Sequence, residues 1–161
     1  MAASARLTSF NRITLFVLVV LSWVSGVGFF VLDSWITVEG DFGPEKHPWQ
    51  FSVLKIHGAV AFLLMIAFGH LLASHVPPGW RVRTMRPLGI ALLVGNVILI
   101  VTAYLLYYLG DESLRLATSY THTVVGVLFP LLLIAHLAQR SRMRRKRRRR
   151  AQTSTTASTH K

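Results

Sequence analysis

Four long apolar stretches, separated by short polar connections, dominate the sequence. They run from about residue 13 to 32, 56 to 76, 88 to 109 and 120 to 137. Each is close to the roughly 20 residues that a helix needs to cross the hydrocarbon core of a bilayer. Proline, glycine or charged residues bound each stretch, as expected at helix ends. The pattern predicts an all-α, integral membrane four-helix bundle in up-down-up-down order over residues 13–140, between a short arm (1–12) and a tail (141–161).

The composition excludes a soluble domain and several kinds of metal site. Of 161 residues, 52% are hydrophobic and 15% charged, and the mean hydropathy is +0.47. Soluble domains average about 25% charged residues. The absence of cysteine excludes disulfides, thiolate metal sites, Fe–S clusters and covalent c-type haem. The first apolar stretch is longer than the core of a cleavable signal peptide, so we expect it to remain as a helix.

The charges are segregated along the chain. There are 18 Lys and Arg against six Asp and Glu, for a net charge of +12. All six acids lie in the first and third connections, whereas the second connection and the tail are basic. The positive-inside rule therefore predicts a multi-pass protein of the bacterial inner membrane with both termini cytoplasmic. We expect the run from Arg140 to Arg150 to bind anionic membrane lipid rather than nucleic acid, and the basic cytoplasmic tail (141–161) to be disordered.

Histidines occur inside two of the four stretches and in neither of the others. The second stretch holds His57, His70 and His75, and the fourth holds His122 and His136. Ionisable residues within membrane helices are costly and mark functional sites. In the predicted topology the two stretches are parallel, so His57 and His122 lie at the same depth near the outer side. His136 lies about 21 Å further in and, 14 residues on, shares a helix face with His122.

Two histidines are candidates to pair with His136 at the inner side. His75 follows His57 by five full turns and shares its face, whereas His70 is rotated by about 220°. The depth of His70, about 20 Å below His57, matches His136 better. Because facing is harder to correct by helix tilt than depth, His75 is favoured and His70 is the alternative.

This arrangement is typical of haem ligation. Two neutral imidazoles from parallel helices supply both axial ligands of a six-coordinate b-type haem. The predicted iron ligands are His57 and His122 for an outer haem, and His136 with His75 or His70 for an inner haem. Haem propionates pair with cations. The candidate cations are Lys55 at the outer end and Arg81, Arg83, Arg86 and Arg140 at the inner end.

Several short segments carry a family resemblance. They are Lys55-Ile56-His57-Gly58, His75-Val76, Leu105-Leu106-Tyr107-Tyr108 and His136. Residues 12 to 140 resemble the four-helix core of the cytochrome b superfamily, in a small bacterial branch. The resemblance implies one or two haems b, electron transfer, and a quinol or a redox protein as partner. It also implies an electron-transfer protein or membrane anchor subunit rather than a stand-alone enzyme. The respiratory members place their second-helix ligands one residue further apart than His57 and His70.

Other interpretations stay open beside this one. Histidines in membrane helices also hydrogen-bond neighbouring helices, so a non-redox scaffold or accessory subunit is the alternative function. Copper or zinc is the alternative metal that the histidines could bind. Four glycines are either clearance sites for a porphyrin or ordinary helix contacts: Gly26, Gly28, Gly95 and Gly126.

The sequence also contains a weak internal similarity. Residues 24–33 are similar to residues 101–111, and His57-x3-Ala61 is similar to His122-x3-Gly126. This predicts a duplicated two-helix unit in which the second and fourth helices are equivalent.

Overall fold

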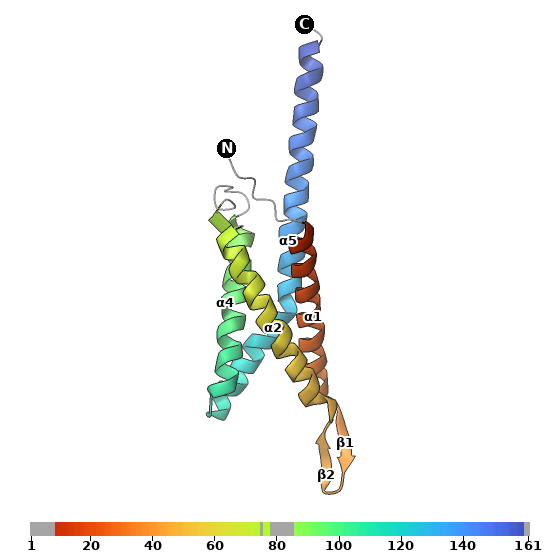
Figure 1. The fold of residues 1–161 in the computed structure, drawn as a ribbon, viewed down its shortest axis with the longest axis vertical. Helices are drawn as coiled ribbons and strands as arrows, with labels where there is room; N and C mark the ends of the chain where they lie inside the picture. Colours follow the sequence, from red (N-terminus) through yellow and green to blue (C-terminus); the bar gives the residue numbers. More distant parts are fainter. Residues whose placement is uncertain (1–8, 75, 78–85, 160–161) are drawn as a thin grey trace.

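Four long helices and one short β-ribbon make up the computed structural model, which describes residues 9–74, 76–77 and 86–159 (Figure 1). The elements are α1 (Ser9–Ser34), β1 (Thr37–Gly40), β2 (Gly43–Lys46), α2 (Trp49–Ser74), α4 (Arg86–Tyr108) and α5 (Glu112–Thr159). Each predicted apolar stretch falls on one of the four helices. The helices extend past the apolar residues at several ends because polar residues continue the same backbone hydrogen bonding.

The helices form two antiparallel pairs. α1 packs along α2, α4 packs along α5, and α1 also packs against α5. The helices alternate in direction, so both chain termini lie at one end of the bundle and the β-ribbon at the other (Figure 1). We call these the tail end and the hairpin end. α2 and α5, which carry the histidines, therefore run in the same direction.

The first connection folds into a ribbon that the sequence did not predict. β1 and β2 are antiparallel, with Thr37 opposite Lys46 and Gly40 opposite Gly43. Gly43 has φ +120°, a conformation that glycine adopts without strain.

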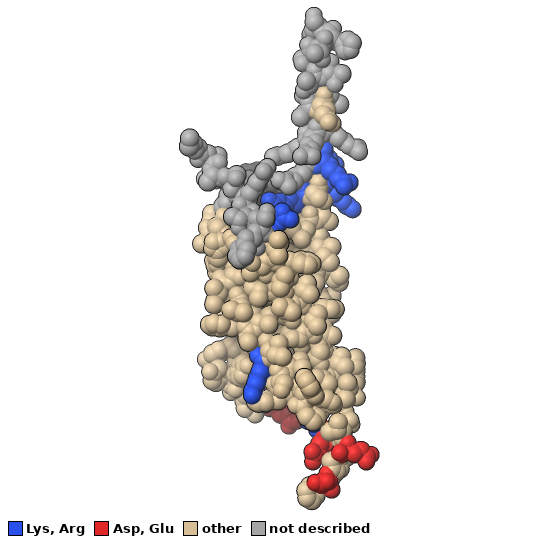
Figure 2. Space-filling model, turned by 45° about the vertical axis from the view of Figure 1, so that its right-hand side comes forward, with Lys and Arg blue, Asp and Glu red and all other residues tan. Residues whose placement is uncertain are grey.

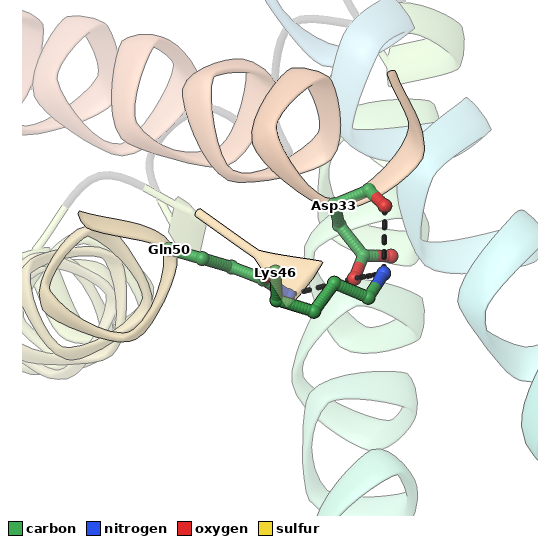
Figure 3. A network of polar contacts seen from close by, with 3 residues as sticks. All are labelled: Asp33, Lys46 and Gln50. Atoms are coloured by element: carbon green, nitrogen blue, oxygen red, sulfur yellow. Dashed lines mark hydrogen bonds and ion pairs between the residues drawn. The ribbon is translucent and has the colours of Figure 1, made fainter. Parts of the chain in front are cut away.

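A small polar cluster ties this ribbon to the helices (Figure 3). The Lys46 ammonium donates to the Asp33 carboxylate at 2.9 Å and to the Asp33 carbonyl at 2.8 Å. The Gln50 amide donates to the same carboxylate at 2.7 Å. Asp33 lies in the last turn of α1 and Gln50 in the first turn of α2, so the cluster fixes the ribbon at the junction of these two helices.

The bundle leaves its apolar side chains largely uncovered. Among the described residues no apolar side chain is fully buried, and Phe16 and Leu131 are 60% and 61% exposed. Each helix contains an 18-residue window with mean hydropathy between 1.8 and 2.5. Exposure of an apolar surface of this extent to water is unfavourable. The four helices are long and apolar enough to cross a membrane, where lipid covers such surfaces and each helix satisfies its own backbone.

α5 is longer than its apolar stretch. Its helical backbone continues to Thr159, whereas the sequence predicted an irregular tail from about residue 141. The difference has a physical reason, because Arg, Lys, Gln and Ala favour helix and an existing helix extends without a new nucleation step. Figure 2 shows the acidic residues gathered at the hairpin end and most of the visible Lys and Arg near the tail end.

Candidate functional site

The side chains of His57 on α2 and His122 on α5 meet inside the bundle. Their ring centroids are 6.3 Å apart and the ring planes are perpendicular, at 90°. Both side chains are half-buried. His57 lies about two turns after the start of α2 and His122 about three turns after the start of α5, so the pair lies toward the hairpin end. Because the two helices belong to different antiparallel pairs, the ring contact joins the two halves of the bundle.

Hydrogen bonds from α1 orient the His57 ring. Its Nδ1 lies 3.0 Å from the Ser22 carbonyl oxygen and 3.1 Å from Ser25 Oγ. A carbonyl oxygen only accepts, so Nδ1 carries the proton. Ser25 Oγ uses its own hydrogen on the Leu21 carbonyl, at 2.7 Å, and so accepts from the ring. In the neutral ring, the lone pair is therefore on Nε2.

A hydrogen bond to α4 orients the His122 ring in the same way. Its Nδ1 lies 2.8 Å from Thr102 Oγ1, whose hydrogen is donated to the Ile98 carbonyl at 2.7 Å. Thr102 Oγ1 therefore accepts from the His122 Nδ1–H. Thr102 is among the most buried polar residues described, with 8% of its surface exposed. His122 consequently also keeps its lone pair on Nε2.

The two Nε2 atoms are the chemically available groups of this site. Nδ1 and Nε2 flank Cε1 of an imidazole, so a ring whose Nδ1 is hydrogen-bonded to α1 or α4 keeps the Nε2 lone pair for a further partner. The Nδ1–Cε1–Nε2 edge of His57 faces Gly26 of α1, where a Cβ would lie 3.7 Å from Nε2. No hydrogen bond to either Nε2 is found within the described part of the chain. A metal–nitrogen bond of about 2 Å, plus about 1 Å to the ring centre, separates the centres of two trans imidazole ligands by roughly 6 Å. The observed 6.3 Å fits two ligands of one ion.

The described residues contain no group of three or more His, Cys, Asp or Glu side chains that could hold a metal ion. A metal held by side chains alone is therefore not indicated in that part of the chain. Haem iron differs because the porphyrin supplies four nitrogens and the protein needs to supply only two. The donor set of His57 and His122 fits that requirement.

Gly26 makes the close approach of His57 to α1 possible. A Cβ atom at this position would lie 2.9 Å from His57 Cε1, closer than real contacts allow. The other three glycines singled out in the sequence have only ordinary contacts: a Cβ would lie 3.8 Å from Val53 at Gly28, 3.6 Å from Phe129 at Gly95 and 3.7 Å from Leu99 at Gly126. Of these four positions, Gly26 is therefore the one at which a side chain would collide with the His57 ring.

The histidines toward the tail end are directed to different helices. His70 Nε2 lies 3.2 Å from the amide nitrogen of Asn11 on α1. The His136 ring lies 4.0 Å from where a Cβ on Gly89 of α4 would be. Within the described residues, a ring contact like that of His57 and His122 is not found between His70 and His136. His75, the favoured partner of His136, lies outside the described residues.

The predicted propionate cations are distributed over both ends. The Lys55 ammonium lies over the Phe51 ring, 4.4 Å from its centroid, on an exposed part of α2. Arg86 begins α4 at the tail end, and Arg140 lies on α5 near the same end; both are half-buried. Arg81 and Arg83 fall outside the described residues.

The sequence did not identify Ser25 and Thr102 as site residues. The available signal was the internal similarity, which aligns Ser25 with Thr102 across segments 24–33 and 101–111. Each is followed along the chain by the histidine that it contacts, 32 and 20 residues later.

Known proteins give no indication of function for this chain. No protein-family model matches the chain, and no match is found among curated proteins or solved structures.

Proposed function

We propose that the chain is a membrane-bound b-type cytochrome that carries electrons, with His57 and His122 as the axial ligands of one haem. The observation that carries the proposal is the paired geometry of the two rings: perpendicular, 6.3 Å apart, and each anchored through Nδ1. A bound haem would supply reversible one-electron chemistry. The chain itself holds the two nitrogens in place and keeps them in an apolar surrounding.

The hydrogen bonds favour iron ligands over histidines that merely connect helices. A metal-ligating histidine almost always donates its other N–H to an oxygen acceptor, which fixes tautomer and ring orientation. Both rings here do so. A purely structural histidine in an apolar region should satisfy both nitrogens, because an unpaired polar atom there costs about 1–3 kcal/mol. Two neighbouring rings that each keep an Nε2 lone pair favour a shared electron-pair acceptor.

The charge distribution supports an orientation for the proposed membrane protein. The acids lie at the hairpin end and the basic run of α5 at the tail end (Figure 2). We assign the tail end, with both termini, to the cytoplasmic side of a bacterial inner membrane, where the basic run would bind anionic lipid. The haem would then lie toward the outer side, with a quinol or a redox protein as electron partner.

A second haem at the tail end stays a prediction. Its ligands would be His136 with His75 or His70. The described residues support the level of His57 and His122, because a ring contact is found between those two.

A reduced-minus-oxidised visible spectrum of the purified protein tests the proposal. We expect a b-type haem spectrum, and His57→Ala and His122→Ala should each bind one haem fewer per chain than the wild type, because each substitution removes one iron ligand. His136→Ala is the matched control, since it removes a histidine from α5 without touching the pair. It should retain the haem held by His57 and His122; if the wild type binds two haems per chain, it should bind one.

Two results would overturn the proposal. A wild-type protein that stays colourless when expressed with ample haem would favour the non-redox scaffold. A haem content per chain that is unchanged in both His57→Ala and His122→Ala would remove these residues as ligands.

A further inference from the structure

Each half of the bundle contributes the same two parts to the site. One helix supplies the histidine, and its antiparallel partner supplies a hydroxyl that accepts from Nδ1: Ser25 for His57, at 3.1 Å, and Thr102 for His122, at 2.8 Å. In both cases the hydroxyl hydrogen is committed to the carbonyl four residues earlier in its own helix, at 2.7 Å. The two arrangements correspond through the internal similarity of segments 24–33 and 101–111.

The backbone bond determines what the hydroxyl can do. A serine or threonine hydroxyl has one hydrogen and accepts through its oxygen lone pairs. With the hydrogen directed at the helix carbonyl, the two lone pairs have fixed directions, and they accept only from a ring nitrogen that carries a proton. The hydroxyl thus selects the tautomer with Nδ1–H and sets the rotation of the ring about its bond to Cβ.

From this we infer that Ser25 and Thr102 are positioning residues that hold the two imidazoles perpendicular and in the ligating tautomer, and that they thereby lower the reduction potential of the haem. The inference rests on the proposed function. A histidine that donates from Nδ1 to an oxygen is a more basic ligand at Nε2. A more basic ligand stabilises ferric relative to ferrous iron, so loss of the acceptor should raise the potential.

Thr102 should have the larger effect of the two. Its bond to the ring is shorter, and Thr102 is 8% exposed, so no water replaces the lost oxygen. His57 keeps the Ser22 carbonyl, at 3.0 Å, when the Ser25 hydroxyl is removed. The decisive variant is therefore Thr102→Val, which replaces the hydroxyl with a methyl group of similar size.

The experiment compares Thr102→Val with Thr102→Ser and with Thr121→Val. Thr121 is the matched control because its hydroxyl makes the same kind of helix bond, to the Ala117 carbonyl at 2.8 Å, on an exposed face of α5. For each protein we would measure haem content, the midpoint potential in a redox titration, and the ferric low-spin electron paramagnetic resonance spectrum. That spectrum depends on the angle between the planes of the axial imidazoles.

For Thr102→Val we expect haem affinity to fall about 10- to 100-fold, the midpoint potential to rise and the ferric spectrum to change. Thr102→Ser should restore all three, and Thr121→Val should match the wild type. A coloured wild type in which Thr102→Val leaves potential and spectrum unchanged overturns this inference and leaves the proposed function standing. A colourless wild type overturns both. Should Thr102→Val fail to fold, Ser25→Ala replaces it, with the same upward shift expected and an unchanged potential as the contradicting result.

Discussion

Replacement of Gly26 by alanine probes the contact on which the site depends. The added Cβ would lie 2.9 Å from His57 Cε1, whereas ordinary contacts begin at 3.4 Å. The ring must therefore move by about half an ångström away from α1. It cannot do so freely, because its Nδ1 is bonded to Ser22 and Ser25 on that same helix. We expect Gly26→Ala to lose haem and to reduce the stability of the protein.

The size of the effect follows from a comparison with Gly28→Ala. Alanine gains about 1 kcal/mol over glycine in a helix interior, and this gain is common to both positions. At Gly28 the new Cβ would meet only Val53, at 3.8 Å, so the gain remains. At Gly26 overpacking costs about 1–3 kcal/mol. The two variants should therefore differ by about 1–3 kcal/mol in the free energy of unfolding, with Gly26→Ala the less stable.

The assay is thermal unfolding in detergent, followed by circular dichroism, together with haem quantified per chain. Gly28→Ala should be as stable as the wild type or more so and should keep its haem. Equal haem content and equal unfolding temperatures for the two variants would show that the His57 ring does not pack too closely on α1 to admit a Cβ at position 26.

Two more predictions concern the ends of the bundle. The side chains of Lys46 and Asp33 are 61% and 43% exposed, so their ion pair is screened by solvent. Asp33→Asn should therefore lower the free energy of unfolding by at most about 1 kcal/mol. Limited proteolysis should then cut the β-ribbon faster while the unfolding temperature of the bundle hardly changes; a large fall in that temperature would show that the ribbon supports the helices. Because the chain has no cysteine, single cysteines report its orientation cleanly. A membrane-impermeant maleimide should label Phe42→Cys in intact cells and Gln152→Cys only after lysis, and the opposite pattern would invert the proposed topology.

The helices were predictable because their signal is local and strong. A run of about 20 apolar residues specifies a membrane helix almost regardless of its neighbours. Counting residues from the helix ends also placed His57 and His122 at one depth, and the structure brings their rings together. The β-ribbon was harder, since its two-residue turn, Asp41-Phe42, lacks the usual glycine-containing signal and Pro44 lies in β2.

The partners of the histidines were not predictable, for a different reason. Helices that are apolar all round carry little information about which face turns inward. The rotation of α1, which directs Ser25 and Gly26 at His57 and Asn11 at His70, is set by packing between residues that are 32 and 59 positions apart. The same uncertainty in rotation left the choice between His70 and His75 open.

The division of the bundle into two halves has a consequence for how the protein is made. α1 packs with α2 and α4 with α5, while the halves meet mainly where α1 packs against α5. A haem held by one histidine from each half would act as a cross-link between two separately inserted hairpins. Since a ligand that binds only the assembled form stabilises it by mass action, the supply of haem would set the yield of assembled protein as well as its redox activity.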